Sequence, residues 1–273
     1  MLLLVDLDGV VYRGDVPVPG VPALLRHRVA AGDTVVYVTN NSRWHRRAYV
    51  ARLRGMDAPV SDAAIVTAAR ATALALVEAA APTAGPVMVF GGPGLAQEVR
   101  DVGLRTVAPS PHGLAARPDV VVVGVDFALT YERLSIAAEA VRRGARFVAT
   151  NRDPIFPTPD GLAAGAGSIV AALVVAAGRE PDLVVGKPEP GLFLEAAHMA
   201  GIPADQAVVI GDGLLTDIAA ARRVGARSVL VLTGVTTPAQ ADLVTDGPLA
   251  PTAIAADAAG LAAILDRFSR TDP

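Results

Sequence analysis

Residues 2–9 read LLLVDLDG, a short apolar run that ends at an acid and is followed two positions later by a second acid. A continuous apolar run of this kind is typical of a strand that is buried on both faces of a parallel sheet. Asp6 and Asp8 can share one side of an extended chain, and Gly9 allows the backbone to turn sharply away. Taken alone, this stretch is better explained by solvated acids at a strand end than by a site.

Similar apolar runs return along the chain and alternate with longer amphipathic segments, which predicts βαβ units and a parallel sheet. Strands are expected at residues 2–5, 34–38, 87–90, 120–123, 147–149, 183–185, 207–210 and 228–232. Helices are expected at residues 22–31, 43–54, 68–80, 95–102, 131–142, 167–177, 190–200, 215–224 and 257–268.

Polar residues stand at or just past the ends of four of these runs, namely Asp6, Thr39, Lys187 and Asp212. In an open α/β sheet, ligands bind at the edge where the carboxyl ends of the strands meet. All four residues come from the first fifth and the last third of the chain. We therefore predict an α/β fold with a discontinuous, Rossmann-like parallel-sheet core at residues 1–66 and 186–273, and a second α/β domain inserted at residues 67–185.

The composition narrows the class of protein. The chain of 273 residues is long enough for about two domains, and its 52% hydrophobic content excludes disorder. A net charge of −3 disfavours a nucleic-acid partner, and the lack of cysteine excludes disulfides and zinc–thiolate sites. The longest uncharged apolar stretch, residues 161–178, is rich in glycine and a poor membrane span. No signal-peptide pattern opens the sequence, so a cytoplasmic protein is expected.

The acids at the strand ends predict a metal site. Asp212 could simply cap the helix that follows it. Several carboxylates that converge at one edge, however, repel one another unless a cation neutralises them. No histidine stands at a strand end, so the ligands are hard oxygens, and these favour Mg²⁺.

Two further segments are typical of anion binding. Thr39, Asn40 and Asn41 precede a predicted helix, where side chains and free backbone N–H groups can cradle a phosphate. Ordinary helix capping explains this segment better when it is taken alone. Lys187 is the only lysine among 24 basic residues, the rest being arginine. A compact ammonium fits a crowded site that would exclude a planar guanidinium.

Taken together and in order, four segments resemble the motifs of the haloacid dehalogenase (HAD) superfamily. They are DLDGVV at 6–11, VTNNS at 38–42, GKPEP at 186–190 and GDGLLTDI at 211–218. The resemblance is strongest to its subfamily IIA phosphatases with a C2-type cap, the group that contains NagD-like, phosphoglycolate or glycerol-3-phosphate, and 4-nitrophenyl phosphatases. Residues 149–158 and 161–173 are similar to segments of that cap.

The resemblance implies a phosphatase mechanism. Asp6 would attack phosphorus to form an aspartyl phosphate, and Asp8 would protonate the leaving group and then activate water. Mg²⁺ would be held by Asp6, Asp212 and the backbone carbonyl of Asp8. Thr39, Asn40, Asn41 and Lys187 would bind the phosphate, and Asp217 would orient Lys187 or a water molecule on the metal.

In caps of this kind the loop at residues 151–159 selects the substrate, here through Asp153, Ile155 and Phe156. Pyridoxal phosphate phosphatases have a histidine where this chain has Phe156, which disfavours vitamin B6 phosphate. Glycerol 3-phosphate or phosphoglycolate is the preferred substrate, with nucleotides and sugar phosphates as alternatives. The resemblance also favours a homodimer and leaves a phosphomutase open.

Two readings from other classes stay open beside the phosphatase. One is a non-catalytic protein that binds phosphorylated metabolites, which would need the anion cradle but not both Asp6 and Asp8. The other is an NAD-dependent oxidoreductase, which would rest on the glycines at residues 91–94. Those glycines lack the spacing of a dinucleotide fingerprint.

Overall fold

The computed structural model describes residues 1–61, 64–78, 85–158, 161–244 and 246–271. The chain divides into two compact units, each an α/β structure built on a parallel sheet. The first unit contains Met1–Thr39, Arg47–Val66 and Lys187–Pro273, and the second contains Asn40–Arg46 and Thr67–Gly186. The predicted α/β fold class is therefore confirmed. The expected helix end at 79–80 and residue 159 of the expected loop lie outside the described residues.

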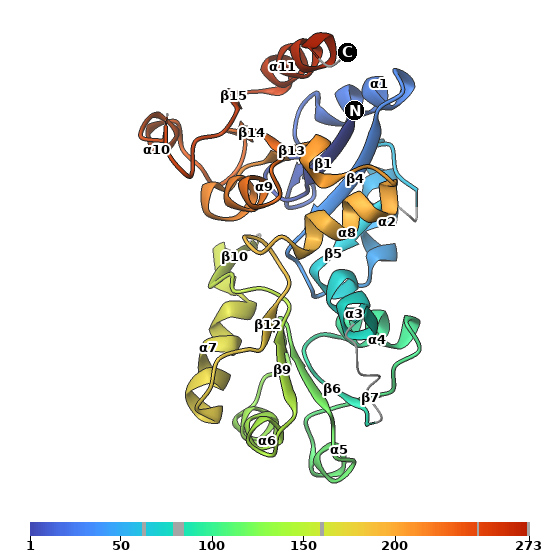
Figure 1. Ribbon diagram of the computed structural model, residues 1–273, viewed down its shortest axis with the longest axis vertical. Helices are drawn as coiled ribbons and strands as arrows, with labels where there is room; N and C mark the ends of the chain where they lie inside the picture. The colour runs from blue at the N-terminus through green and yellow to red at the C-terminus, as the bar shows by residue number, and fades with distance from the viewer. Residues whose placement is uncertain (62–63, 79–84, 159–160, 245, 272–273) are drawn as a thin grey trace. The chain divides into compact units, whose positions relative to one another are not determined.

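The first unit is organised by a six-stranded sheet with the order β15-β14-β13-β1-β4-β5 (Figure 1). Its strands are β1 (Leu2–Asp6), β4 (Thr34–Thr39), β5 (Ile65–Thr67), β13 (Ala207–Gly211), β14 (Arg227–Val231) and β15 (Ala253–Ala255). Strand β1 lies between β13 and β4 and pairs with both in parallel. The first strand is fully buried, which explains why its sequence is a continuous apolar run.

Helices cover both faces of this sheet. They are α1 (Val21–Ala30), α2 (Arg46–Gly55), α8 (Gly191–Ala200), α9 (Ala219–Arg223), α10 (Pro238–Asp242) and α11 (Ala258–Thr271). Alternate residues of β1, Leu3 and Val5, share one hydrophobic core with residues of α1, α2 and α11. Helix α8 contacts β1 and β4 without contributing to that core, so it covers the other face. A short antiparallel hairpin, β2 (Tyr12–Arg13) and β3 (Val16–Pro17), follows β1 and was not expected.

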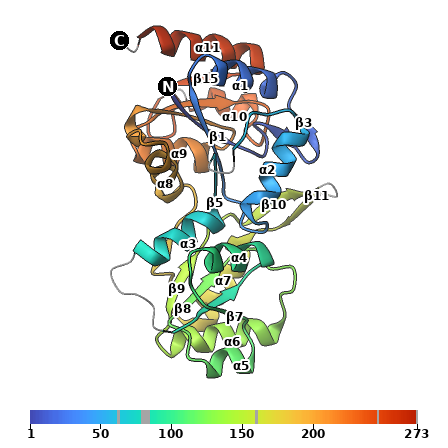
Figure 2. The same cartoon turned by 90° about the vertical axis from the view of Figure 1, so that its right-hand side faces the viewer.

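The second unit has a five-stranded parallel sheet with the order β12-β9-β8-β6-β7. Its strands are β6 (Val87–Phe90), β7 (Thr106–Val107), β8 (Val120–Val123), β9 (Arg146–Ala149) and β12 (Leu183–Val184). Its helices are α3 (Ala68–Glu78), α4 (Pro93–Asp101), α5 (Pro111–Ala115), α6 (Tyr131–Arg142) and α7 (Ala166–Ala177). An antiparallel hairpin, β10 (Ile155–Thr158) and β11 (Gly161–Ala164), precedes α7 (Figure 2).

The two units differ from the expected domains at residues 40–46. Residues 40–46, which we assigned to the discontinuous domain, pack in the second unit. The buried hydroxyl of Ser42 accepts a hydrogen bond from the Val125 amide (3.3 Å) and lies 3.2 Å from the Thr150 hydroxyl. Helix α2 accordingly begins at Arg46 rather than at residue 43. The strand before Lys187, β12, pairs with β9 in the second unit.

Among the helices of the described ranges, none combines the length and the apolar character that crossing a bilayer requires.

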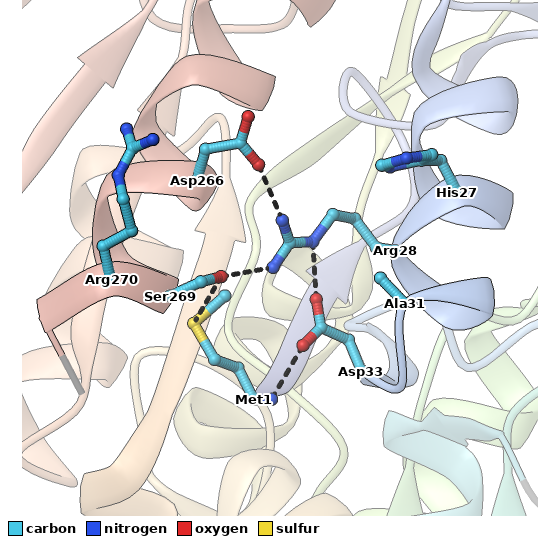
Figure 3. A pocket seen from close by; sticks show the side chains of 8 residues that line it. All are labelled: Met1, His27, Arg28, Ala31, Asp33, Asp266, Ser269 and Arg270. Carbon is cyan, nitrogen blue, oxygen red and sulfur yellow. Dashed lines mark hydrogen bonds and ion pairs between the residues drawn. The ribbon is translucent and has the colours of Figure 1, made fainter. Parts of the chain in front are cut away.

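A buried arginine ties three parts of the first unit together in a cavity of about 520 Å³ (Figure 3). Arg28 of α1 donates from Nε to Asp33 (2.5 Å), from Nη1 to Asp266 (2.9 Å) and from Nη2 to Ser269 (2.7 Å). The last two residues belong to α11, so this one side chain links the helix to α1 and to the start of β4. Each of the three guanidinium nitrogens thus donates to a residue of the first unit, so we assign this cavity a structural role.

Replacing Arg28 with methionine is expected to destabilise the first unit by about 3 kcal/mol, because Asp33 loses a buried cation and α11 loses its hydrogen bonds to α1. The same change at Arg26 is the matched control. Its ion pair with Asp57 is exposed, and such pairs contribute below about 1 kcal/mol. Thermal unfolding of the two variants measures the difference. Equal Tm values for both would contradict the proposed structural role of Arg28.

Candidate active site

Three of the predicted residues reach the same end of the core sheet. Asp6 is the last residue of β1, and its partner on β4 is Val38, so Thr39 lies one position beyond it. On the other side, Val5 pairs with Ile210 of β13, which places Asp212 just past the strand end. Asp6 (7% exposed), Thr39 and Asp212 are all buried. The expectation that these side chains share a sheet edge is met by the register of the strands.

Lys187 enters this edge from the chain that returns from the second unit. Its Nζ donates to Asp6 Oδ1 at 2.5 Å and to Asp217 Oδ1 at 2.6 Å, and its side chain is only 3% exposed. Asp217 lies in a π-helical turn, Leu214–Ile218, and its other carboxylate oxygen accepts the backbone N–H of Gly213 at 3.1 Å. The lone lysine is therefore held between two buried carboxylates.

A loop after β14 fixes the third carboxylate. Asp212 Oδ2 accepts the Val235 N–H at 2.7 Å, and the Asp212 carbonyl accepts the Thr236 hydroxyl at 2.5 Å. The Thr233 hydroxyl donates to the carbonyl of Gly9 at 2.6 Å, so the same loop also holds the turn after Asp6. A Cβ added to Gly234 would lie 1.7 Å from Asp212 Oδ2. Glycine is thus required at residue 234 by close approach.

The electrostatics follow from burial. Burial raises the pKa of Asp6 well above its usual value, and the Asp217 and Asp212 carboxylates raise it further, whereas Lys187 lowers it. Burial, followed by the charge of Asp217, raises the pKa of Asp212 to about 7. Burial alone would lower the pKa of Lys187, but Asp217 and Asp6 raise it overall, so the ammonium stays protonated. The Lys187 ammonium thus lowers the pKa of Asp6 and Asp212 and forms an ion pair with Asp217.

This cluster can hold a metal ion. Carboxylate oxygens of Asp6, Asp212 and Asp217 all lie within 4.8 Å of one another, and all three residues are buried. The donor set contains only hard oxygens, which suits Mg²⁺. The side chain of Asp8 is not in this group of three, whereas the resemblance gives its backbone carbonyl as the ligand.

Asp8 lies in a turn held by backbone contacts. Asp8 forms an isolated β-bridge with Tyr12. The Gly9 N–H donates to the Tyr12 carbonyl at 2.8 Å, and the Tyr12 N–H donates to the Leu7 carbonyl at 3.2 Å. In the described part of the chain, no residue hydrogen-bonds to the Asp8 carboxyl. Burial raises its pKa, and Arg52 and Lys187 lower it. Its position therefore depends on the turn.

The remaining predicted residues lie in the second unit. The Asn40 amide donates to Asp153 at 2.9 Å, and Asn41 Oδ1 accepts the Arg43 N–H at 2.9 Å. Ile155 is exposed, and the Phe156 ring meets Phe127 edge-to-face with a centroid distance of 6.2 Å. The substrate roles predicted for these residues stay predictions.

A second group of titratable side chains in this unit does not need a cation. A ring nitrogen of His45 and carboxylate oxygens of Glu98 and Asp101 lie within 4.8 Å of one another. The Arg46 guanidinium forms ion pairs with both Glu98 and Asp101, and His45 Nε2 lies 2.9 Å from Asp101. The acids are thus neutralised by protein cations, and the group anchors residues 45 and 46 to α4.

The loop 233–236, whose glycine and threonines shape the Asp212 site, was not predicted from the sequence. A signal was available, because TGVT directly follows the apolar run at 228–232, and the ends of parallel strands share one edge. The contribution of Tyr12 and Arg52 near Asp8 was also missed. It depends on a contact between a hairpin residue and a helix residue that are 40 positions apart in the chain, which local pattern does not connect.

Family models match both ends of the chain. The haloacid dehalogenase-like hydrolase model matches residues 3–105, and a HAD-hydrolase-like model matches residues 184–265. A D-glycerol 3-phosphate phosphatase of Mycobacterium tuberculosis is 41% identical over 234 residues, which are 85% of this chain. The chain spans 63% of the length of that relative. A Bacillus subtilis 5'-nucleotidase is 33% identical, and a Staphylococcus aureus acid sugar phosphatase is 35% identical. The matches cover 85% and 86% of this chain, and 87% of each relative.

Solved structures are similar over nearly the whole chain. The p-nitrophenyl phosphatase from Archaeoglobus fulgidus matches with a TM-score of 0.88 and 34% identity, covering 96% of this chain and 98% of that one. The glycerol phosphate phosphatase from Mycobacterium tuberculosis in complex with magnesium matches with a TM-score of 0.86 and 37% identity. That match covers 95% of this chain and 75% of the other.

Proposed function

The chain belongs to the haloacid dehalogenase-like hydrolases, and from this premise we propose that it is a Mg²⁺-dependent phosphatase of small phosphate monoesters. The observation that carries the proposal is the buried cluster at the edge of the core sheet. There Lys187 joins Asp6 to Asp217, and Asp212 lies within reach of both acids. A carboxylate nucleophile and a fixed cation in one water-poor site suit phosphoryl transfer.

Asp6 is the nucleophile in this proposal. Its carboxylate oxygen attacks phosphorus while the bond from phosphorus to the leaving oxygen breaks, which forms an aspartyl phosphate. The Lys187 ammonium, already 2.5 Å from Asp6, neutralises charge on the transferring group, and Asp217 holds that ammonium in place. Thr39, one position beyond the strand partner of Asp6, supplies a hydroxyl to a phosphate oxygen.

Asp8 moves the proton. It gives its proton to the leaving oxygen in the first step, and in the second it takes a proton from the water that attacks phosphorus and frees Asp6. Burial raises the pKa of Asp8, which is the direction that a proton donor needs. The absence of other hydrogen bonds to this carboxyl within the described residues leaves it available for the transfer.

The residues present fit Mg²⁺. Lys187 forms ion pairs with two of the three buried carboxylates, Asp6 and Asp217, and a divalent cation would neutralise the negative charge that remains in the cluster. Asp6, Asp212 and the backbone carbonyl of Asp8 would hold the ion. Bound there, it lets an anionic nucleophile approach an anionic phosphate. The solved relative in complex with magnesium supports this assignment.

The substrate proposed first is glycerol 3-phosphate or phosphoglycolate, with the second unit acting as the cap. The 41% identity to a D-glycerol 3-phosphate phosphatase supports the former. A nucleotide or a sugar phosphate is the alternative, since a 5'-nucleotidase and an acid sugar phosphatase are also relatives. Asp153 and Phe156 of the β10–β11 region are proposed to select among them.

Release of inorganic phosphate from these four classes of monoester, with Mg²⁺ and with a chelator, tests the proposal. We expect Mg²⁺-dependent release, and the ranking of kcat/KM identifies the substrate class. No release from any compound by the folded protein would overturn the phosphatase, and transfer of phosphate between sugars would favour a mutase. Sedimentation of the same preparation tests the homodimer that the resemblance implies.

Replacing Gly234 with alanine is expected to weaken Mg²⁺ binding about 10–100-fold, because the new methyl group must displace the Asp212 carboxylate. Titration calorimetry with Mg²⁺ measures the change. Gly55→Ala is the control, since a methyl group there meets open space at the end of α2. An unchanged Kd in the Gly234 variant would remove Asp212 from the proposed ligands.

A further inference from the structure

Arg52 of α2 clamps the hairpin that follows the catalytic turn. Its guanidinium lies over the Tyr12 ring, with 4.1 Å between Cζ and the ring centroid. The same group donates to the Gly14 carbonyl and, at 2.9 Å, to Asp15 Oδ1. One side chain therefore fixes both the start and the tip of the β2–β3 hairpin.

The hairpin in turn fixes Asp8. Tyr12 is completely buried, and its backbone accepts the Gly9 N–H, donates to Leu7 and bridges to Asp8. Since no described residue hydrogen-bonds to the Asp8 carboxyl, these backbone contacts are what places it. Movement of Tyr12 would therefore move Asp8.

Stability does not explain this arrangement well. Arg52 and Tyr12, which stack on each other, each have a buried polar atom without a hydrogen-bond partner among the described residues. These atoms are Arg52 Nε and the Tyr12 hydroxyl. Each unsatisfied polar group lowers the free energy of unfolding, so stability alone is a poor explanation for an arginine at residue 52. The ion pair with Asp15 adds little, because the Asp15 side chain is 95% exposed.

We propose that Arg52 is a positioning residue for Asp8, which it acts on through Tyr12 and the turn that Tyr12 holds. The inference rests on the proposed function, in which Asp8 protonates the leaving group.

The leaving group of the substrate provides the test. An alkoxide needs a proton as it departs, whereas p-nitrophenolate leaves readily without one, so a misplaced general acid harms only the first. For Arg52→Met we expect kcat/KM to fall about 30-fold with glycerol 3-phosphate and less than about 3-fold with p-nitrophenyl phosphate. Because kcat/KM reports the steps up to transfer onto Asp6, the comparison isolates the protonation step.

Two further variants complete the experiment. Arg52→Lys keeps the positive charge, so its kcat/KM with glycerol 3-phosphate is expected to lie between those of the unmodified protein and the Met variant. The Lys variant also provides the test if the Met variant does not fold. Asp15→Asn removes only the exposed partner of Arg52, and kcat/KM with both substrates is expected to stay within about 2-fold of the unmodified protein. An equal fall with both substrates in the Arg52 variants, or no fall, overturns the positioning role. If the unmodified protein hydrolyses neither p-nitrophenyl phosphate nor any of the four classes of monoester, the proposed function itself is overturned.

Discussion

Asp6→Asn is expected to lower kcat by a factor on the order of 10⁴ or more while the fold is kept. Asparagine has the shape of aspartate, but its amide cannot form the acyl phosphate that the proposed mechanism requires. The change also removes one negative charge from a buried cluster of three acids, and Lys187 keeps its 2.6 Å contact with Asp217. The Tm should therefore not fall together with the activity.

The measurement combines phosphate release with trapping of the intermediate. Rapid acid quenching should capture a phosphorylated protein in the unmodified enzyme and none in the Asp6 variant. Asp15→Asn makes the same chemical change on an exposed side chain and should keep both signals. Retention of more than about a hundredth of the activity by the Asp6 variant would show that another group attacks phosphorus.

The position of Asp6 could be predicted because its causes are local. An apolar run of four buried residues, Leu2–Val5, makes the strand, and parallel pairing brings the ends of such strands to one edge. Asp212 and Thr39 follow from the same rule applied to the neighbouring runs. Lys187 was singled out by its place just past an apolar run and by composition, as the one lysine in an arginine-rich chain.

The features that escaped prediction depend on contacts between distant parts of the chain. The two-residue strands of the β2–β3 hairpin are too short to show an alternating pattern. Residues 40–46 follow a core strand, yet Ser42 is buried against Val125 and Thr150, about 80 and 110 residues later. The β10–β11 hairpin was hidden because its second strand opens an apolar stretch that continues into α7.

Lys187→Arg is expected to lower kcat/KM about 10²–10³-fold even at saturating Mg²⁺. Lys187 is 3% exposed and reaches Asp6 and Asp217 at 2.5 and 2.6 Å with a single atom. A guanidinium keeps the charge, but its planar fork is larger and would occupy space next to Asp6 that the phosphate needs. Steady-state kinetics with the preferred substrate measure the loss.

Lys187→Met separates the charge from the shape. It leaves Asp6 and Asp217 buried without their shared cation, which should cost about 3 kcal/mol of stability, whereas the Arg variant keeps a cation and should unfold at a higher Tm than the Met variant. Loss of activity in both variants, with loss of stability mainly in the Met variant, is the result expected if the ammonium both balances the acids and holds the phosphate. An Arg variant within threefold of the unmodified enzyme would show that charge alone is enough, and the single lysine of this chain would then be replaceable like any of its other cations.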